Sequence, residues 1–370
     1  MKILFLYLTA FSTDGGIEKF NKAFMKVLYE SENVQFKAIS SHDGGCHKRY
    51  ISIDNFKGFS GNKVLFGMEA VADAGKYDTV ILGHINLAPV AVLIKMFYPD
   101  KRLILITHGI EVWGKLTALK RQLLQDADEI ITVSDFTRNK LLEKKVNPKK
   151  IKILHNTIDP YFDYPDNFEK PDFLKSRYSI DKNEKIILTV CRISSAEKYK
   201  GYDKVIEALP EVLKIFPKIK YILVGKYDEF ERKRIMEKID RLSLENNVIL
   251  TGFIPDSELQ AHYLLADVFA MPSSGEGFGI VFLEAIACGL SVIMGNRDGS
   301  KEILSKIEIG LSVNPDDIHE LSSAIITLLN REIYDKEINA SRTMELFGFD
   351  VFRSQVKQLV NVNVAEVIEA

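Results

Sequence analysis

The chain has 370 residues, 46% of them hydrophobic, which exceeds what one hydrophobic core usually supports, so two domains are expected. Its 49 basic and 51 acidic side chains leave a net charge of -2, which gives no general electrostatic basis for binding nucleic acid. Cys46, Cys191 and Cys288 are far apart and lack CxxC spacing, so neither a disulfide framework nor a zinc site is predicted, and a cytoplasmic location is expected.

The first part of the chain alternates short apolar runs with amphipathic segments. The opening MKILFLYLTAF is followed by STDGGIEKF rather than by small residues at a cleavage site, which predicts a buried strand and not a signal peptide. Further strands are predicted at TVILG, LILITHG and EIITVS. Strands that alternate with helices indicate βαβ units on a parallel sheet, here in a first domain over 1–165. The longest uncharged apolar run, LAPVAVLI, is far shorter than the ~20 residues of a membrane helix.

A second α/β series follows a polar stretch. Residues 163–185 contain two prolines and no sustained periodicity, which predicts a surface connection between domains. The second domain is predicted over 166–345, with strands at IILTVCRI, KYILVG, NVILTG, DVFAMPS and LSVIMG. A final helix is expected at 344–362, and a separate C-terminal segment is predicted at 346–370. Doubly wound sheets bind ligands outside the carboxyl ends of their strands, so the expected site is a cleft between the two domains.

The segment EGFGIVFLE carries the strongest functional pattern. Glu276 and Glu284 lie eight positions apart around a turn in which Gly277 and Gly279 let the backbone approach a ligand. The first turn of the following helix has free N–H groups for phosphate oxygens, and Glu284 lies where a ribose diol could reach it. On local grounds alone, a buried helix with two incidental glutamates is an equal alternative.

Other candidates also fall at strand ends. Arg192 follows one strand and Lys200 precedes a helix, so both could offset the charge of a diphosphate, although surface charge explains them as well. Gly252, Phe253 and Ile254 follow the strand NVIL, where a flat base could lie, or they form a plain turn.

In the first domain, Gly15 and Gly16 open a helix without the GxGxxG pattern of a dinucleotide site. His108 ends a strand beside Gly109, where it is either a ligand contact or a structural hydrogen-bonding residue.

These residues stand in an order that resembles the GT-B glycosyltransferases of the large retaining family 4, of bacterial type. The resemblance covers nearly the whole chain: GGIE at Gly15, THGIEVW at His108, ITVSDFTR at Ser134 and HNTID at Asn156. The second half adds Arg192, KG at Lys200, LVG at Gly225, LTGFIPD at Gly252 and the two glutamates of an E-x7-E motif. The resemblance implies an α/β fold of the GT-B class, with two Rossmann-like doubly wound domains facing across a cleft and a C-terminal helix at 346–370 that packs back on the first domain.

The resemblance implies roles residue by residue. Lys200 and Arg192 bind the donor diphosphate, Glu276 holds the donor sugar, and His108 contacts that sugar from the acceptor side. Donor binding is further expected of Gly16, Gly252, Phe253, Ile254, Gly277, Phe278, Gly279, Ile280, Val281 and Glu284. No metal and no cofactor are expected, and the same-face transfer is expected to be driven by stabilising the leaving diphosphate.

The chain departs from the family pattern at a few positions. Thr157 stands where a glycine is common, and Lys226 with Tyr227 replaces a glycine-containing turn. The longer gap between Arg192 and Lys200 leaves open whether Arg192 contacts the diphosphate. Asp298 and Glu302, in GNRDGSKEIL, are expected only to shape the site.

The expected function is therefore transfer of a hexose to a saccharide or lipid-linked acceptor in surface polysaccharide or glycolipid biosynthesis. UDP-hexose, and UDP-glucose in particular, is the favoured donor, with GDP-mannose second. A GT-B nucleotide-sugar 2-epimerase and a non-catalytic sugar-nucleotide-binding protein are the alternatives. Basic and apolar residues from Trp113 to Leu123, with lysines over 144–152, suggest contact with an anionic membrane surface, and an ordinary helix with a solvated face explains them equally well.

Overall fold

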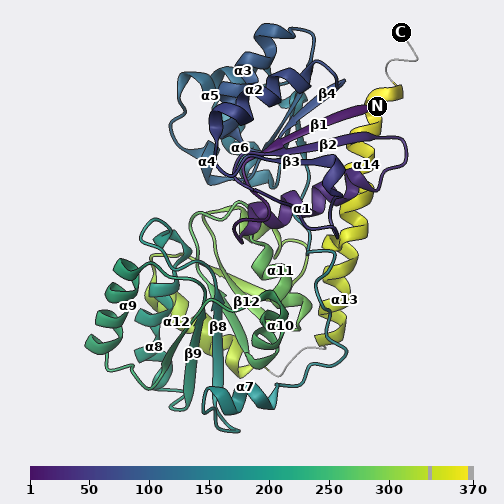
Figure 1. The fold of residues 1–370 in the computed structure, drawn as a ribbon. Coiled ribbons are helices and arrows are strands. Elements are labelled where there is room, and N and C mark those ends of the chain that lie inside the picture. Colours follow the sequence, from purple (N-terminus) through teal and green to yellow (C-terminus); the bar gives the residue numbers. More distant parts are fainter. Residues whose placement is uncertain (332–335, 366–370) are drawn as a thin grey trace. The chain divides into compact units, whose positions relative to one another are not determined.

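The computed structural model describes residues 1–331 and 336–365, and the chain divides into two compact units. Unit 1 comprises 1–161 together with the C-terminal residues from Phe347, and unit 2 comprises 162–346. Figure 1 shows a parallel sheet with helices on both of its faces in each unit. The predicted fold class, α/β with two doubly wound sheets, is confirmed.

Unit 1 contains a seven-stranded sheet in the order β3-β2-β1-β4-β5-β6-β7, in which every neighbouring pair is parallel. Its strands are β1 (Lys2–Tyr7), β2 (Gln35–Ser40), β3 (Phe56–Gly58), β4 (Thr79–Leu82), β5 (Arg102–Thr107), β6 (Glu129–Thr132) and β7 (Ile151–Ile153). Its α-helices are α1 (Gly16–Tyr29), α2 (Lys63–Ala74), α3 (Ala88–Phe97), α4 (Ile110–Trp113), α5 (Ala118–Asp126), α6 (Asp135–Glu143) and α14 (Phe349–Ala365).

The layers of unit 1 follow from where its apolar residues are buried. Helices α2, α3, α5 and α6 share one core with the sheet, and α1 lies on the other face with α14 packed against it (Figure 1). Strand β1 is buried from Ile3 onward, which explains its continuous apolar run, because a central parallel strand is covered on both faces. The predicted strand at the start of the chain is therefore confirmed.

Unit 2 contains a six-stranded parallel sheet in the order β10-β9-β8-β11-β12-β13. Its strands are β8 (Lys185–Val190), β9 (Ile219–Val224), β10 (Val248–Gly252), β11 (Val268–Met271), β12 (Ser291–Gly295) and β13 (Gly310–Val313). Its helices are α7 (Asp172–Arg177), the 3-10 turn η4 (Lys198–Lys200), α8 (Tyr202–Leu213), α9 (Glu229–Arg241), α10 (Asp256–Leu265), α11 (Ile280–Ala287), η5 (Gly299–Glu302), α12 (Ile318–Asn330) and α13 (Lys336–Phe347).

Two predictions about connecting segments need correction. Residues 163–185 are not a plain connection, because they contain α7, whose Leu174 is buried and whose Arg177 pairs with Glu258 of α10 at 2.6 Å. Pro171 stands just before this helix, where proline is tolerated, so it marks a helix start and not a break. The single helix expected at 344–362 is divided into α13 and α14, which meet at Gly348, a residue that disfavours helix. Residues 366–370 of the predicted C-terminal segment lie outside the described residues.

Thr157, the departure from the family glycine, fixes the chain where α14 begins. Its hydroxyl donates to the Phe347 carbonyl at 2.8 Å, and the Ile158 amide donates to the same carbonyl at 3.4 Å. Within the described part of the chain, no helix is long and apolar enough to cross a bilayer.

Phe352 anchors α14, and we expect its loss to loosen this helix. Its ring is 2% exposed and meets Phe20 of α1 edge-on with 5.6 Å between centroids. Phe352→Ala should lower the local stability by about 3–5 kcal/mol, the usual cost of such a truncation, measured as faster hydrogen exchange in α1 and α14. The exposed change Ser354→Ala on the same helix should alter exchange by less than about 0.5 kcal/mol. Equal exchange rates in the two variants would contradict this anchoring role.

Candidate functional site

The lysine of the KG pair is placed by a glycine that the backbone requires. Lys200 ends η4 and Gly201 precedes α8 with φ +77°, a left-handed conformation. A Cβ at Gly201 would also lie 2.4 Å from the Pro272 carbonyl oxygen, so only glycine fits there. The chain therefore presents Lys200 beside the loop that follows β11.

Lys200 and Glu276 form a salt bridge in unit 2. The Lys200 ammonium donates to Glu276 Oε1, and the two side chains are only 17% and 14% exposed. Burial acts to lower the pKa of Lys200, but the charge of Glu276 outweighs it, and the pKa is raised well above its ordinary value. Lys200 Nζ also lies 5.5 Å from the ring centre of Tyr199. Lys200 is thus a fixed positive charge in a largely desolvated position.

The backbone of Glu276 is held on both sides by the loop after β12. The buried Asp298 accepts a hydrogen bond from the Glu276 amide at 2.8 Å, and the Gly299 amide donates to the Glu276 carbonyl at 2.9 Å. Asp298 also accepts from the Ser273 hydroxyl at 2.5 Å, from the Ser300 hydroxyl at 2.6 Å and from the Ser300 amide at 3.0 Å. Asp298, which the sequence led us to expect only to shape the site, therefore binds the glutamate loop directly.

Burial raises the pKa of Asp298 to about 6. The hydrogen bonds from Ser273, Ser300 and the Glu276 amide act to lower the pKa, and the Glu276 charge acts to raise it. The carboxylate is therefore held in its ionised form against a substantial desolvation cost at neutral pH.

Helix α11 begins at the predicted glycine turn. Gly279 precedes it with φ +89°, and no side chain of the described residues caps the helix. The Phe282 amide donates to the Gly279 carbonyl at 3.1 Å, so the first turn does not offer all of its amides to a ligand. Phe278 and Ile280 are buried, while Gly277 and Val281 are partly exposed. Glu284 is fully buried and accepts a hydrogen bond from the Tyr263 hydroxyl at 2.9 Å.

Arg192 lies in an exposed position and has an acidic neighbour. Its guanidinium pairs with Glu197 at 2.7 Å, inside the longer segment that separates it from Lys200. This segment is braced by Asp228, which accepts from the Ser195 amide at 2.8 Å and its hydroxyl at 3.1 Å. The long gap is thus an ordered loop.

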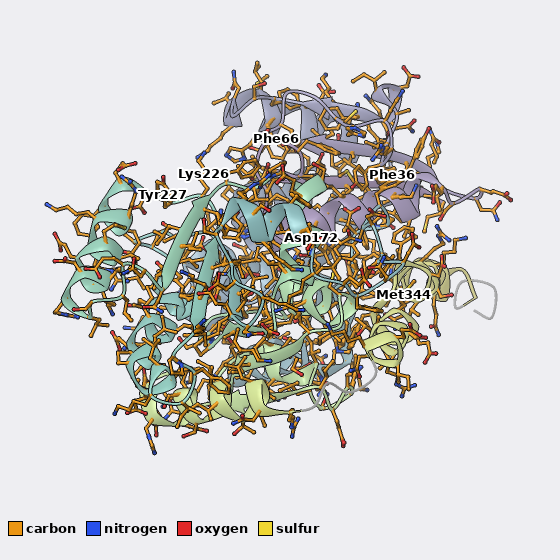
Figure 2. The ribbon with its side chains drawn as sticks, turned by 90° about the horizontal axis from the view of Figure 1, so that it is seen from below. Phe36, Phe66, Asp172, Lys226, Tyr227 and Met344 are labelled. Atoms are coloured by element: carbon orange, nitrogen blue, oxygen red, sulfur yellow. The ribbon has the colours of Figure 1, made fainter. Side chains whose placement is uncertain are left out.

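The proposed base-binding residues lie at the end of β10. Gly252 has φ +73°, Phe253 is 60% exposed and Ile254 is partly exposed. Tyr227, labelled beside Lys226 in Figure 2, forms a parallel bridge with Ile193, and a Cβ at Gly252 would lie 3.7 Å from its ring. Gly252 therefore lies next to the ring of Tyr227 and the exposed side chain of Phe253.

In unit 1, His108 lies where the sequence predicts, at the end of β5. Its Nε2 donates to the Gly83 carbonyl at 2.9 Å, which leaves Nδ1 as the acceptor nitrogen of the ring. The backbone amide of His108 donates to the Glu111 carboxylate at 2.6 Å. Burial lowers the pKa of His108, and burial likewise lowers the pKa of the neighbouring His84 to about 4. Both imidazoles are neutral at physiological pH.

The glycine loop of unit 1 is also braced by a buried carboxylate. Gly15 precedes α1 in an extended conformation, and the space beside Gly16 is open. The loop leading to them is held by Asp43, which accepts from the amides of Ala10 at 2.8 Å, Phe11 at 3.0 Å and Ser12 at 2.8 Å. Hydrogen bonds, with those from Ser12 and Ser40 hydroxyls among them, outweigh burial and lower the pKa of Asp43.

Sequence reasoning missed the residues that support the site. These are Tyr199, Tyr263, Ser273, Asp43, Asp228 and the direct role of Asp298. For the three aspartates, the only local signal is an acidic residue a few positions beyond a strand end, which is common in loops, and we find no local signal for the two tyrosines and the serine. Within 1–331 and 336–365, no group of three or more His, Cys, Asp or Glu side chains is placed to hold a metal ion.

The fold has clear counterparts among solved structures. Anabaena HepE in complex with UDP matches with a TM-score of 0.81 and 20% identity, covering 98% of this chain and all of that one. The apo lipopolysaccharide outer core galactosyltransferase WaaB matches with a TM-score of 0.72 and 16% identity, over 99% of this chain and all of that one. The two doubly wound sheets and the similarity to these two structures show that the chain has a GT-B fold.

The chain belongs to the family 4 glycosyltransferases. The family models "Glycosyl transferases group 1" and "Glycosyltransferase Family 4" match residues 172–343 and 40–162. A relative from Mycolicibacterium smegmatis, a GDP-mannose-dependent alpha-(1-6)-phosphatidylinositol monomannoside mannosyltransferase, is 32% identical over 69% of this chain and 68% of its own length. The alpha-monoglucosyldiacylglycerol synthase of Streptococcus pneumoniae is 30% identical over 57% of this chain and 46% of its own length. The predicted family and a glycosyltransferase activity are confirmed.

Asp298 predicts a pH dependence of stability. Its folded-state pKa of about 6 exceeds the ordinary 3.8, so the protonated group stabilises the fold; this stabilisation is complete below pH 3.8 and lost as pH rises through 6. Relative to Asp298→Asn, the unfolding free energy of the wild type should fall by up to about 3 kcal/mol between pH 4 and 7.5, at ~1.4 kcal/mol per pH unit. Urea unfolding at several pH values measures the difference, with the exposed Asp316→Asn as the charge control. A difference that does not vary with pH would exclude the raised pKa.

Proposed function

We propose that this glycosyltransferase moves a hexose from a nucleoside diphosphate sugar to a glycolipid or lipid-linked saccharide, retaining the anomeric configuration without a divalent metal. The observation that carries the proposal is the largely buried Lys200–Glu276 salt bridge, with side chains 17% and 14% exposed, beside the start of α11. A buried ammonium needs an anion, and here that anion is a carboxylate that a diphosphate could replace. Glu276 would then be released to accept hydrogen bonds from sugar hydroxyls.

The proposed chemistry is a displacement on one face of the sugar. The bond from the anomeric carbon to the diphosphate oxygen breaks, the acceptor oxygen bonds to that carbon, and the acceptor proton passes to the departing diphosphate. Lys200, Arg192 and the amides of α11 are the groups that would stabilise the charge that develops on the diphosphate. Glu276 is kept as a ligand of the sugar and not as a covalent nucleophile.

The remaining site residues take supporting roles in this proposal. Glu284 would bind the ribose diol, with Tyr263 orienting its carboxylate. Gly252, Phe253 and Ile254 would hold the base against the end of β10. In unit 1, neutral His108 would accept a hydrogen bond through Nδ1 from a sugar hydroxyl, and the amide of Gly16 would approach phosphate.

The acceptor class rests on the named relatives. The M. smegmatis enzyme is named for a phosphatidylinositol monomannoside and the S. pneumoniae enzyme for a diacylglycerol glycolipid, so lipid acceptors recur among the relatives. The same names point to different donors, since the first is GDP-mannose-dependent and the second makes a glucosyl lipid. UDP-glucose and GDP-mannose are therefore the two donors to compare directly.

Donor binding tests the assignment of the site. Calorimetry with UDP-glucose, UDP-galactose, UDP-N-acetylglucosamine and GDP-mannose, without metal, should find one donor that binds in the micromolar range. Glu284→Gln should weaken that donor by about 1–3 kcal/mol, because the ribose loses a charged hydrogen-bond acceptor. Tyr263→Phe, which removes only the hydroxyl that donates to Glu284, should cost less. If no donor binds, or if Glu284→Gln binds as the wild type does, the donor site is wrongly assigned.

Transfer itself tests the role of Lys200. Lys200→Ala should lower kcat/KM by about 10²–10³-fold, because a preorganised charge on the leaving group is lost. The assay follows radiolabelled sugar from the binding donor into extracted lipid, with and without a chelator, and the anomeric proton of the product gives the stereochemistry. Lys204→Ala, which removes a partly exposed lysine of α8 paired with Glu207, is the matched control. Full activity of Lys200→Ala, or an inverted product, would refute the mechanism.

We also propose that unit 1 rests on an anionic membrane surface. A pocket of about 990 Å³ combines Trp113, Leu116 and Val146 with five cations and a single glutamate; the charged lining is Lys115, Arg121, Glu143, Lys144, Lys145 and Lys150. Nearby helices α2 and α3 expose Val64, Met68 and Phe97, each more than 60% accessible, along a groove of about 680 Å³. Apolar side chains beside cations suit the boundary of a bilayer that contains anionic lipid.

Charge reversal at two exposed lysines tests this surface. Lys144 and Lys150 donate to backbone carbonyls, so Lys115 and Lys145 are the better targets. Lys115→Glu with Lys145→Glu should weaken sedimentation with phosphatidylglycerol vesicles at least tenfold, at about 1 kcal/mol for each basic residue lost. Lys182→Glu with Lys214→Glu in unit 2 matches the change in net charge. Equal binding by the two double variants, or no binding by the wild type, would remove the membrane from the proposal.

A further inference from the structure

The carboxylate of Asp298 accepts four hydrogen bonds from three residues. Oδ2 accepts from the Glu276 amide at 2.8 Å and the Ser273 hydroxyl at 2.5 Å. Oδ1 accepts from the Ser300 amide at 3.0 Å and the Ser300 hydroxyl at 2.6 Å. Each oxygen therefore holds one backbone N–H, which can only donate, and one hydroxyl, which can turn.

This arrangement connects two loops that the sheet brings together. Asp298 follows β12, whereas Ser273 and Glu276 follow β11, and β11 and β12 are paired neighbours. Ser300 lies close to the end of the loop after β11. A Cβ placed at Gly279, the residue just before α11, would be 3.7 Å from the Cβ of Ser300. Asp298 and Gly299 thus hold the backbone at Glu276, while Ser300 only lies close to Gly279.

We propose that Asp298 is a positioning residue for the sugar half of the donor: it fixes the main chain of Glu276 so that this carboxylate meets the hexose. The inference rests on the proposed function and deepens it. Lys200, Arg192 and the α11 amides are the groups assigned to the diphosphate, and none of them hydrogen-bonds to Asp298 among the contacts of the described residues. Loss of Asp298 should therefore affect recognition of the sugar more than recognition of the nucleotide.

Asp298→Asn tests this with almost no change in volume. Whichever way the amide turns, its NH₂ group faces either the Glu276 or the Ser300 backbone N–H, so one of these donors loses its acceptor. We expect binding of the donor sugar nucleotide to weaken at least tenfold, binding of the matching nucleoside diphosphate to change less than threefold, and kcat of transfer to fall at least tenfold. Calorimetry and the transfer assay on the full chain measure all three.

Two further variants separate positioning from folding. Asp316→Asn, an exposed change in the same part of unit 2, should behave as the wild type. If Asp298→Asn does not fold, the double variant Ser273→Ala with Ser300→Ala keeps the carboxylate and both backbone donors but removes the two hydroxyls. It should weaken the sugar nucleotide at least threefold more than the nucleoside diphosphate.

The outcomes distinguish this inference from the proposed function. Equal losses for sugar nucleotide and nucleoside diphosphate, or no loss for either, would overturn the positioning role while a binding wild type keeps the proposed function intact. A wild type that binds neither ligand would instead refute the proposed function, and the inference would fail with it.

Discussion

The functional loops of both units depend on one recurring constraint, a carboxylate at the end of one strand that holds the loop of the neighbouring strand. Asp43 follows β2 and accepts amides of the loop after β1. Asp228 follows β9 and accepts the Ser195 amide after β8. Asp298 follows β12 and accepts the Glu276 amide after β11. Because these strands are parallel neighbours, their carboxyl ends lie at one edge, where an acceptor on one loop reaches donors on the next.

The three carboxylates differ in how far their hydrogen bonds offset burial. Hydrogen bonds to several donors lower the pKa of Asp43 and of Asp228, so ionisation favours the folded state at both sites. At Asp298 burial prevails and raises the pKa to about 6, so ionisation at neutral pH opposes folding. The buried charge of Asp298 thus lowers the stability of the fold while it fixes the loop of Glu276. Such a loss of stability is expected at sites where a loop must be held in a defined position.

Much of the fold could be predicted because its signals are local. Nine strands were found from apolar runs, and β1 and β8 match within a residue or two at their starts. The strands β2, β3, β7 and β13 were missed, since they are short or interrupted by polar residues such as Lys37 and Lys152. In the site, the left-handed φ of +77° at Gly201 is a local demand that favours glycine, which explains why the KG motif could be recognised from the sequence. The bond from Asp298 to Glu276 joins residues 22 positions apart and has no such signal.

Two ion pairs neutralise the cations of the candidate site. Lys200 is desolvated, and a lone buried ammonium would be costly, but Glu276 neutralises it and Glu197 does the same for exposed Arg192. On the proposed function, a diphosphate that binds these cations would compete with both glutamates, so part of its attraction would be offset by the loss of the existing ion pairs. Asp298 and Gly299 hold the Glu276 backbone on both sides, so its carboxylate could turn away only as far as the side chain reaches. The released carboxylate would then remain within side-chain reach of Lys200, where the proposal places the sugar of the donor.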